Sequence, residues 1–210
     1  MKLSQSELDK IQSAIAEVER KTSGEIVTVV VKRSDSYLFM PLLGALFGDA
    51  MVSVFMLLTS GSSLSFGDFS SLYFAMVQAV GLLGGAILFS IPWVQRIFLR
   101  ENVFFHAVQR AAEASFVQQG LHHTKNETGI LLYISLHEHR VQILADRGIH
   151  RVVGNEYWKN EVASIVRGIR SGKFIDSVCE TVLRMGETLA KNFPPTPDDT
   201  NELSDRVRTD

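Results

Sequence analysis

The chain has 210 residues, with 21 lysines and arginines against 23 aspartates and glutamates. A net charge of −2 gives no electrostatic basis for binding nucleic acid. The single cysteine, Cys179, excludes an intrachain disulfide and fits a reducing compartment. Residues 1–20 are charged and lack the apolar core of a signal peptide, so any membrane insertion must come from another segment.

An amphipathic helix is predicted at the beginning of the chain. Ser4 and Glu7 have the spacing of a capping box. Apolar residues then recur at helical spacing, at Leu8, Ile11, Ile15 and Val18. The next segment, Glu25–Lys32, is β-branched and almost continuously apolar in its middle. Such a segment is typical of a strand that is covered on both faces, as in an α/β sheet.

Two apolar runs, Leu38–Ser60 and Ser71–Pro92, follow this strand and are joined by the polar segment 61–70. Each run is about 20 residues long, which is enough for a helix to cross a hydrocarbon core of about 30 Å. No lysine or arginine occurs between residues 38 and 95. We therefore predict a transmembrane helical hairpin within residues 38–97. The alternative is a buried hairpin in a soluble protein, whose helices usually carry a polar stripe.

Basic residues flank the predicted hairpin on both sides, at Lys32, Arg33, Arg96 and Arg100. The loop between the spans contains one acidic residue, Asp68, and no basic one. The positive-inside rule then places both termini on the cytoplasmic side of the inner (plasma) membrane. The sequence thus predicts a multi-pass protein with the lipid bilayer as one partner and its non-membrane parts in the cytoplasm.

The predicted spans contain an acidic residue and several glycines. Asp49, near the centre of the first span, costs about 2.5–3.5 kcal/mol to insert. Protonation or a facing helix makes it tolerable, and Gln78 in the second span is the nearest polar candidate. Two small-xxx-small pairs favour close helix packing: Gly44 with Gly48, and Gly81 with Gly85. These residues serve packing within the hairpin, self-association through it, or a protonatable intramembrane site.

The pattern after the hairpin predicts a helix, a β-hairpin and two further helices. The first helix covers Leu99–Gln119, and its predicted inner stripe is Phe104, Val108, Ala111 and Ser115. The strands are Gly129–Leu136 and Arg140–Ala145. Asn155 is the predicted N-cap of a helix through Arg170, and the last helix runs from Phe174 to about Asn192. Residues 194–210 form a predicted mobile tail.

This order of elements, with Thr-x-x-x-x-Gly-Ile-Leu-Leu and Asp-Arg-Gly-Ile around the second hairpin, resembles the TPM domain family. That family includes thylakoid-lumen phosphatase-like proteins and bacterial membrane proteins. The matching parts are Lys21–Val31 and Leu99–Leu203, and Gly129–Ile149 is the most specific. The resemblance implies an α/β fold, a β-sheet flanked by helices on both faces. It also implies one domain split into residues 1–37 and 98–193, as in the bacterial branch with an inserted membrane hairpin.

Carboxylates gather near the end of the second hairpin strand and the start of the following helix. Asp146 and Glu156 lie there, with Glu161 further along the helix and Glu25 at the start of the first strand. Strand ends and helix N-termini are common places for sites in α/β sheets. Oxygen ligands suit Ca²⁺ or Mg²⁺, so Asp146 and Glu156 are the candidate metal ligands. The alternative for Asp146 is a turn residue that caps local backbone or pairs with a neighbouring arginine.

The resemblance implies calcium-binding and phosphatase-like chemistry, but the family pattern is only partly kept. Typical members carry Thr-Gly-x-Gly-x-Glu followed by an aspartate. Asp146 stands at the first glycine of that pattern, His150 at the glutamate and Asn155 near the aspartate, and only Gly148 is retained. The loss of two carboxylates weakens both metal binding and acid–base chemistry.

Three functional hypotheses follow. The first is a non-catalytic, membrane-anchored module that binds a protein partner, or self-associates through its hairpin, to assemble or maintain membrane complexes. The second is a metal-dependent, phosphatase-like hydrolase in which Asp146 and Glu156 hold Ca²⁺ or Mg²⁺. The third is a path for transport or sensing through Asp49 and Gln78. Because the chain has only two predicted spans, such a path requires an oligomer.

Overall fold

The computed structural model describes residues 4–59, 71–124, 126–195 and 207–209. The chain divides into two compact units, one of residues 1–35 with 104–210 and the other of residues 36–103. The first unit is therefore assembled from two pieces of sequence that flank the second. The predicted loop at residues 61–70 and most of the predicted tail lie outside the described residues.

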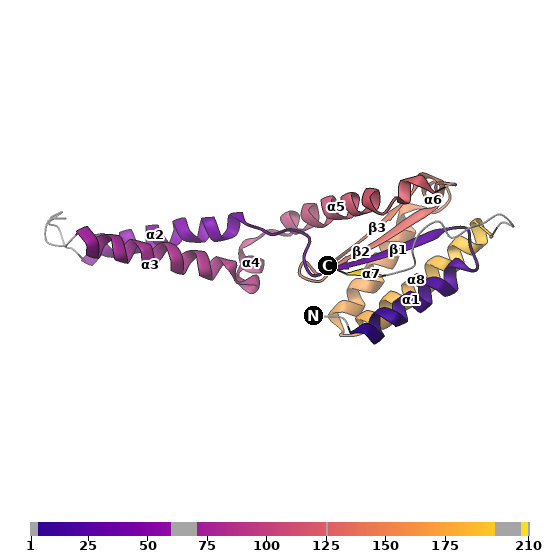
Figure 1. Ribbon diagram of the computed structural model, residues 1–210, viewed down its shortest axis with the longest axis horizontal. Helices are drawn as coiled ribbons and strands as arrows, with labels where there is room; N and C mark the ends of the chain where they lie inside the picture. The colour runs from indigo at the N-terminus through magenta and orange to yellow at the C-terminus, as the bar shows by residue number, and fades with distance from the viewer. Residues whose placement is uncertain (1–3, 60–70, 125, 196–206, 210) are drawn as a thin grey trace. The chain divides into compact units, whose positions relative to one another are not determined.

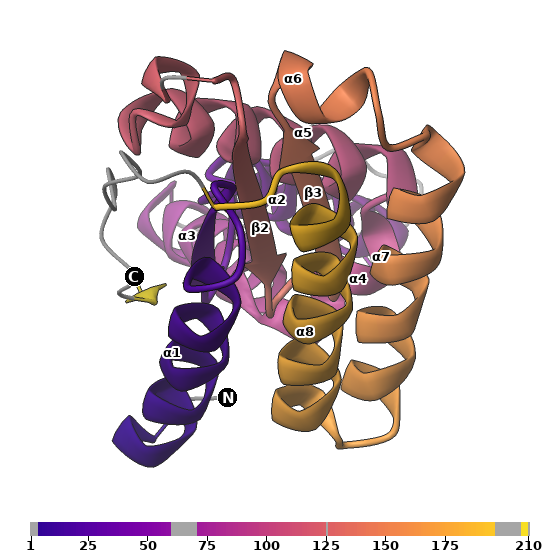
Figure 2. The ribbon, with the colours of Figure 1, turned by 90° about the vertical axis from the view of Figure 1, so that its right-hand side faces the viewer.

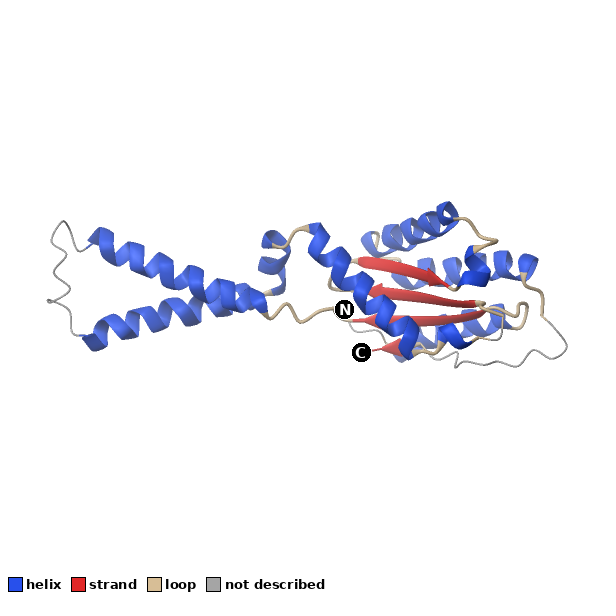
Figure 3. Cartoon of the chain, turned by 90° about the horizontal axis from the view of Figure 1, so that it is seen from above, coloured by secondary structure: helices blue, strands red, loops and turns tan. Residues whose placement is uncertain are grey.

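The first unit is built on a mixed β-sheet with the strand order β3-β2-β1-β4, seen as one layer in Figure 3. Strand β1 (Glu25–Val31) pairs in parallel with β2 (Gly129–Ser135) along its full length. Strand β3 (Arg140–Ala145) returns antiparallel to β2. The short β4 (Arg208–Thr209), which the sequence did not predict, pairs with β1 at the opposite edge.

Helices cover both faces of this sheet, as predicted. Helix α5 (Glu101–Gln118) lies on one face. Helices α1 (Gln5–Glu19), α8 (Phe174–Asn192) and α7 (Asn155–Arg170) cover the other face. They lie side by side there, with α8 between α1 and α7 (Figures 1 and 2). The α/β fold with helices on both faces is therefore confirmed.

The alternation of side chains along β1 explains why that strand is apolar throughout. Ile26 and Val30 point into the core formed with α1 and α8, whereas Val27, Val29 and Val31 point into the core formed with α5. Every residue of β1 and β2 is buried. Each fully buried aliphatic side chain contributes about 1.5–3 kcal/mol, so both cores depend on these two strands.

The structure confirms the predicted capping box of α1 but not the predicted N-cap of α7. The capping box of α1 is present: Ser4 N–H donates to Glu7 Oε2 at 2.7 Å, and Glu7 N–H donates to Ser4 Oγ at 3.4 Å. Gly120 has the left-handed φ of 73° that suits the end of α5. The predicted N-cap at Asn155 is wrong, because Gly154 holds the N-cap position and Asn155 is the first helical residue.

The second unit consists of α2 (Phe39–Thr59), α3 (Ser71–Ser90) and the short α4 (Pro92–Phe98). Both α2 and α3 are long and apolar enough to cross a membrane. Only 6% of the apolar window of α2 and 17% of that of α3 is buried, which differs from the core helices of a soluble domain. Helix α4 was not predicted; Pro92 lies in its first turn, where proline fits without loss of a hydrogen bond.

Candidate functional site

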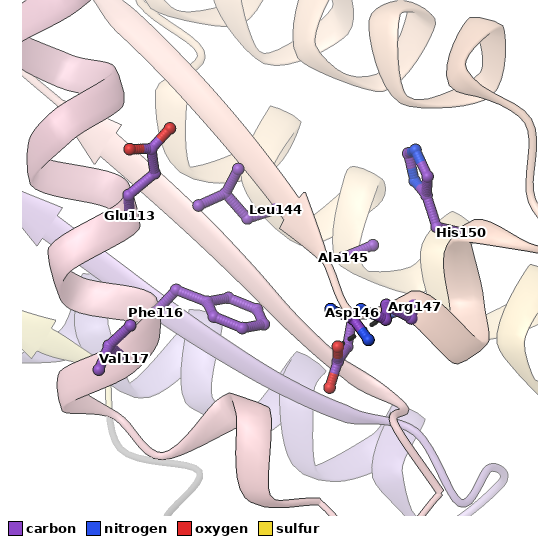
Figure 4. Close-up of a pocket in the computed structure, with 8 residues that line it drawn as sticks. All are labelled: Glu113, Phe116, Val117, Leu144, Ala145, Asp146, Arg147 and His150. Atoms are coloured by element: carbon purple, nitrogen blue, oxygen red, sulfur yellow. Dashed lines mark hydrogen bonds between the residues drawn. The ribbon is translucent and has the colours of Figure 1, made fainter.

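A pocket of about 370 Å³ lies beside the end of β3 in the first unit. Its apolar wall comes from Phe116 and Val117 of α5 and from Leu144 and Ala145 of β3 (Figure 4). Its ionisable lining residues are Glu113, Asp146, Arg147 and His150. The sequence had singled out only Asp146 and, through the family pattern, His150. No local signal connected Glu113 to this region, because α5 reaches the pocket only through the tertiary fold.

Asp146 connects the end of β3 to the four-residue helix α6 (Arg147–His150). Its Oδ1 accepts a hydrogen bond of 2.7 Å from the backbone N–H of Arg147, and its own N–H donates to the carbonyl of Gly129 at 2.9 Å. Its Oδ2 is buried and has no hydrogen-bond partner among the described residues. The carboxylate therefore caps α6 with one oxygen and leaves the other without a bond beside the pocket.

The two predicted metal ligands have different surroundings. The side chain of Glu156 is 80% exposed and its Oε2 lies 3.2 Å from Lys159 Nζ. The ionisable side chains of the pocket point in different directions in Figure 4. Within the described ranges, no group of three or more His, Cys, Asp or Glu side chains could hold a metal ion together. A cation at Asp146 would therefore need further ligands, either water or a carboxylate that moves toward it.

Two other glutamates accept hydrogen bonds that connect different parts of the fold. Glu161 is buried on α7 and accepts hydrogen bonds of 3.1 and 2.8 Å at Oε2 from Arg184 Nε and Nη2 of α8. This hydrogen bonding raises the pKa of Arg184 above its usual value. Glu138, in the turn between β2 and β3, is also buried and accepts from Ser34 N–H at 3.0 Å and from Ser135 Oγ. Sequence reasoning missed Glu138 because an acidic residue in a hairpin turn is ordinarily solvated.

Cys179 does not have the surroundings of a catalytic nucleophile. It lies half-buried on α8, and burial raises the pKa of its thiol above the usual value. A reactive cysteine needs a lowered pKa, because the thiolate is the attacking form. Covalent catalysis through this residue is therefore not supported.

The glycines singled out in the second unit lie where α2 meets α3. A Cβ atom on Gly44 would collide with the carbonyl oxygen of Gly85, and one on Gly48 with that of Gly81. On Gly81, a Cβ would lie 2.7 Å from Val52 Cγ2. Only glycine lets the two backbones approach this closely.

The polar residues of the two apolar helices are paired differently from expectation. Gln78 Nε2 donates to Ser53 Oγ at 2.8 Å rather than to Asp49. Ser53, one turn after Asp49, is therefore the α2 residue that contacts Gln78. This observation corrects the expected contact between Asp49 and Gln78. Asp49 is half-buried, and its side chain makes no hydrogen bond to any residue within the described ranges.

Comparisons with known proteins agree with the fold. Residues 101–188 match the family model of the TPM domain. The NMR structure of the BA42 protein from the psychrophilic bacterium Bizionia argentinensis is similar, with a TM-score of 0.61 and 20% sequence identity. That match covers 100% of this chain and 97% of the other, and at this identity it shows the fold alone. No curated protein matches the chain.

Proposed function

Because residues 101–188 of this chain are a TPM domain, we propose that the protein is a membrane-anchored TPM module that binds a protein partner on the cytoplasmic face. It would help to assemble or maintain membrane complexes without catalysing a reaction itself. The observation that carries the proposal is the pair of long apolar helices joined to the domain.

The surface of α2 and α3 supports anchoring in lipid. Their large apolar side chains are mostly exposed; examples are Leu42, Leu58, Val80 and Ile87, each at least 64% exposed. Exposed apolar surface of this extent is costly in water but matches a hydrocarbon core. Lys32, Arg33, Arg96 and Arg100 flank the pair and favour a cytoplasmic location for the TPM domain.

The uses of the carboxylates support binding rather than catalysis. Glu161 and Glu138 are buried and bonded to other parts of the fold, and Asp146 caps α6. A general acid or base must reach a substrate proton, and a carboxylate held by structural hydrogen bonds is poorly placed to do so. Glu161 and Glu138 thus contribute to the fold in ways that an interaction module also requires.

The first test determines location and partner in intact membranes. In a Cys179→Ser background, a single cysteine at the exposed Ser13 of α1 reports the side on which the domain lies. We expect the protein to resist alkaline extraction, and a membrane-impermeant maleimide to label this cysteine only after lysis. Chemical crosslinking should give a discrete adduct with a second protein. Extraction at high pH, labelling of intact cells or absence of an adduct would each contradict the proposal.

The metal-dependent phosphatase remains a second candidate because Asp146 Oδ2 is buried beside the pocket without a hydrogen-bond partner in the described part of the chain. Ca²⁺ or Mg²⁺ at Asp146 and Glu156 would supply charge stabilisation for phosphoryl transfer. This reading predicts that a cation at 100 times its Kd stabilises the protein by about 2.7 kcal/mol.

The matching measurement is thermal unfolding of the detergent-solubilised protein during a Ca²⁺ or Mg²⁺ titration, with phosphomonoester turnover assayed in the same samples. Asp146→Asn is the informative variant, since asparagine caps a helix as well as aspartate does but removes the charge. A metal-dependent rise in Tm with turnover, both lost in Asp146→Asn, would favour the enzyme. A flat Tm up to millimolar metal would exclude it.

A further inference from the structure

The outer edge of β3 carries backbone groups that pair with no strand among the described residues. Strand β3 is at one end of the sheet, so it has a neighbouring strand on one side only in the described part of the chain. Asp146 donates its backbone N–H to the Gly129 carbonyl of β2. This bond shows which residues of β3 direct their backbone N–H and C=O groups toward β2. In an antiparallel pair these residues alternate, so Gln142 and Leu144 also direct their backbone toward β2. The backbone N–H and C=O groups that point outward are those of Val141, Ile143 and Ala145.

A groove of about 400 Å³ follows this edge between α5 and α7. Its walls are largely apolar and include Phe105 of α5 with Trp158, Val162 and Val166 of α7. Phe105 is 43% exposed, which leaves an aromatic face at the rim. An open strand edge beside apolar walls is the arrangement by which proteins take up an additional strand.

The basic residues of the groove favour an acidic ligand. Arg140 and Lys159 line it, and none of the described lining residues is acidic. The guanidinium carbon of Arg140 lies 5.9 Å from the centre of the Phe105 ring. Lys159 forms an exposed ion pair with Glu156, which is a weak contact that a new carboxylate can replace. The groove therefore complements an acidic segment.

We propose that β3 and this groove bind an extended, acidic segment of a partner protein as an additional β-strand. The proposal rests on the interaction function above and names the surface and the chemistry of the partner. Alternate apolar side chains of the segment would fill the space beside Trp158 and Val162, and its carboxylates would meet Arg140 and Lys159. A second copy of this chain is disfavoured, because two such edges would bring two positively charged grooves together.

The test uses the full chain in lipid nanodiscs and a labelled ten-residue peptide with valine at alternate positions and threonine and glutamate between them. A matched peptide replaces each glutamate with lysine. Fluorescence anisotropy measures affinity, and residue-resolved amide exchange locates the bound peptide. We expect exchange at Val141, Ile143 and Ala145 to slow at least about tenfold, while Gln142 and Leu144, already bonded to β2, change little.

Lys159→Glu should weaken binding of the acidic peptide about three- to tenfold, since it replaces an attraction by a repulsion. Lys10→Glu, an exposed change on α1, is the matched control and should leave the affinity unchanged. Equal binding of the two peptides, no binding of the acidic one, or binding without protection of the three outward amides would overturn the proposal. In those cases a crosslinked adduct in membranes would still support the interaction function. If the acidic peptide bound as expected but no adduct formed in membranes, the proposed interaction function would be contradicted instead.

Discussion

A Gly85→Leu substitution is expected to separate α2 from α3, whereas Gly84→Leu, one residue earlier, should leave the pair intact. A Cβ at Gly85 would overlap the carbonyl oxygen of Gly44, but at Gly84 there is nothing within 4 Å. Forcing extra atoms into a close contact costs about 1–3 kcal/mol. In lipid, helix association has no hydrophobic driving force, so the loss of close backbone packing directly lowers the stability of the α2–α3 pair.

A cysteine crosslinking reporter measures this separation. In a Cys179→Ser background, cysteines at Ser53 and Gln78 replace side chains whose Oγ and Nε2 atoms are 2.8 Å apart. A thiol-specific crosslinker of short span, which replaces the length of the lost glutamine side chain, should link the two helices readily in the parent and in Gly84→Leu. We expect the initial rate to fall at least about fivefold in Gly85→Leu, which corresponds to about 1 kcal/mol. Equal rates in the two leucine variants would show that the glycine contact does not hold the helices together.

The second large effect is expected for Arg184→Met, in the segment that matches the TPM domain. The side chain of Glu161 is only 8% exposed, and removal of the guanidinium leaves its charge buried without a counterion. Breaking a fully buried pair costs about 3–5 kcal/mol. Because Arg184 itself is 40% exposed, water relieves part of that cost, and we expect about 2–4 kcal/mol of destabilisation.

Denaturant unfolding of the full chain in detergent, followed by far-ultraviolet circular dichroism, provides the measurement. Glu180→Ala is the control: Glu180 lies 3.9 Å from Arg184 Nη1 with its side chain 68% exposed, and its loss should cost less than about 1 kcal/mol. The double variant Glu161→Gln with Arg184→Met should recover much of the lost stability, since no charge is then buried. A single variant as stable as the control would refute the role given to this pair.

The parts of the fold that follow from residue periodicity were predictable. Continuous apolar runs identified β1 and β2, and apolar residues at helical spacing identified α1. Such patterns depend only on which residues must leave water. The capping box of α1 was equally visible, because both of its partners lie within one helical turn.

Features that depend on distant neighbours were not predictable. The inner stripe of α5 also includes Ala107 and Ala112, which were not predicted, whereas the predicted Ala111 and Ser115 are only half-buried at its margin, because the sheet, and not helical spacing alone, sets the rotation of the helix. Glu138 and Glu113 carried no sequence signal, since Ser34, which donates to Glu138, and β3, which lies beside Glu113, are far away in the chain. The groove beside β3 is likewise a property of how α5 and α7 flank an edge strand.

The interruption of the first unit by the second has a consequence for biogenesis. Thr128 Oγ1 donates to the carbonyl of Ser23 at 3.0 Å although the two residues are 105 positions apart, and β2 lies next to β1 across the same interval. At about 5–20 residues per second, a ribosome needs roughly 5–20 s to synthesise that interval. During this time the apolar side chains of β1 are exposed, because β2, with which it pairs, has not yet been synthesised. In the proposed arrangement the hairpin enters the bilayer first, so a chaperone or the nascent α1 must shield β1 until translation delivers β2.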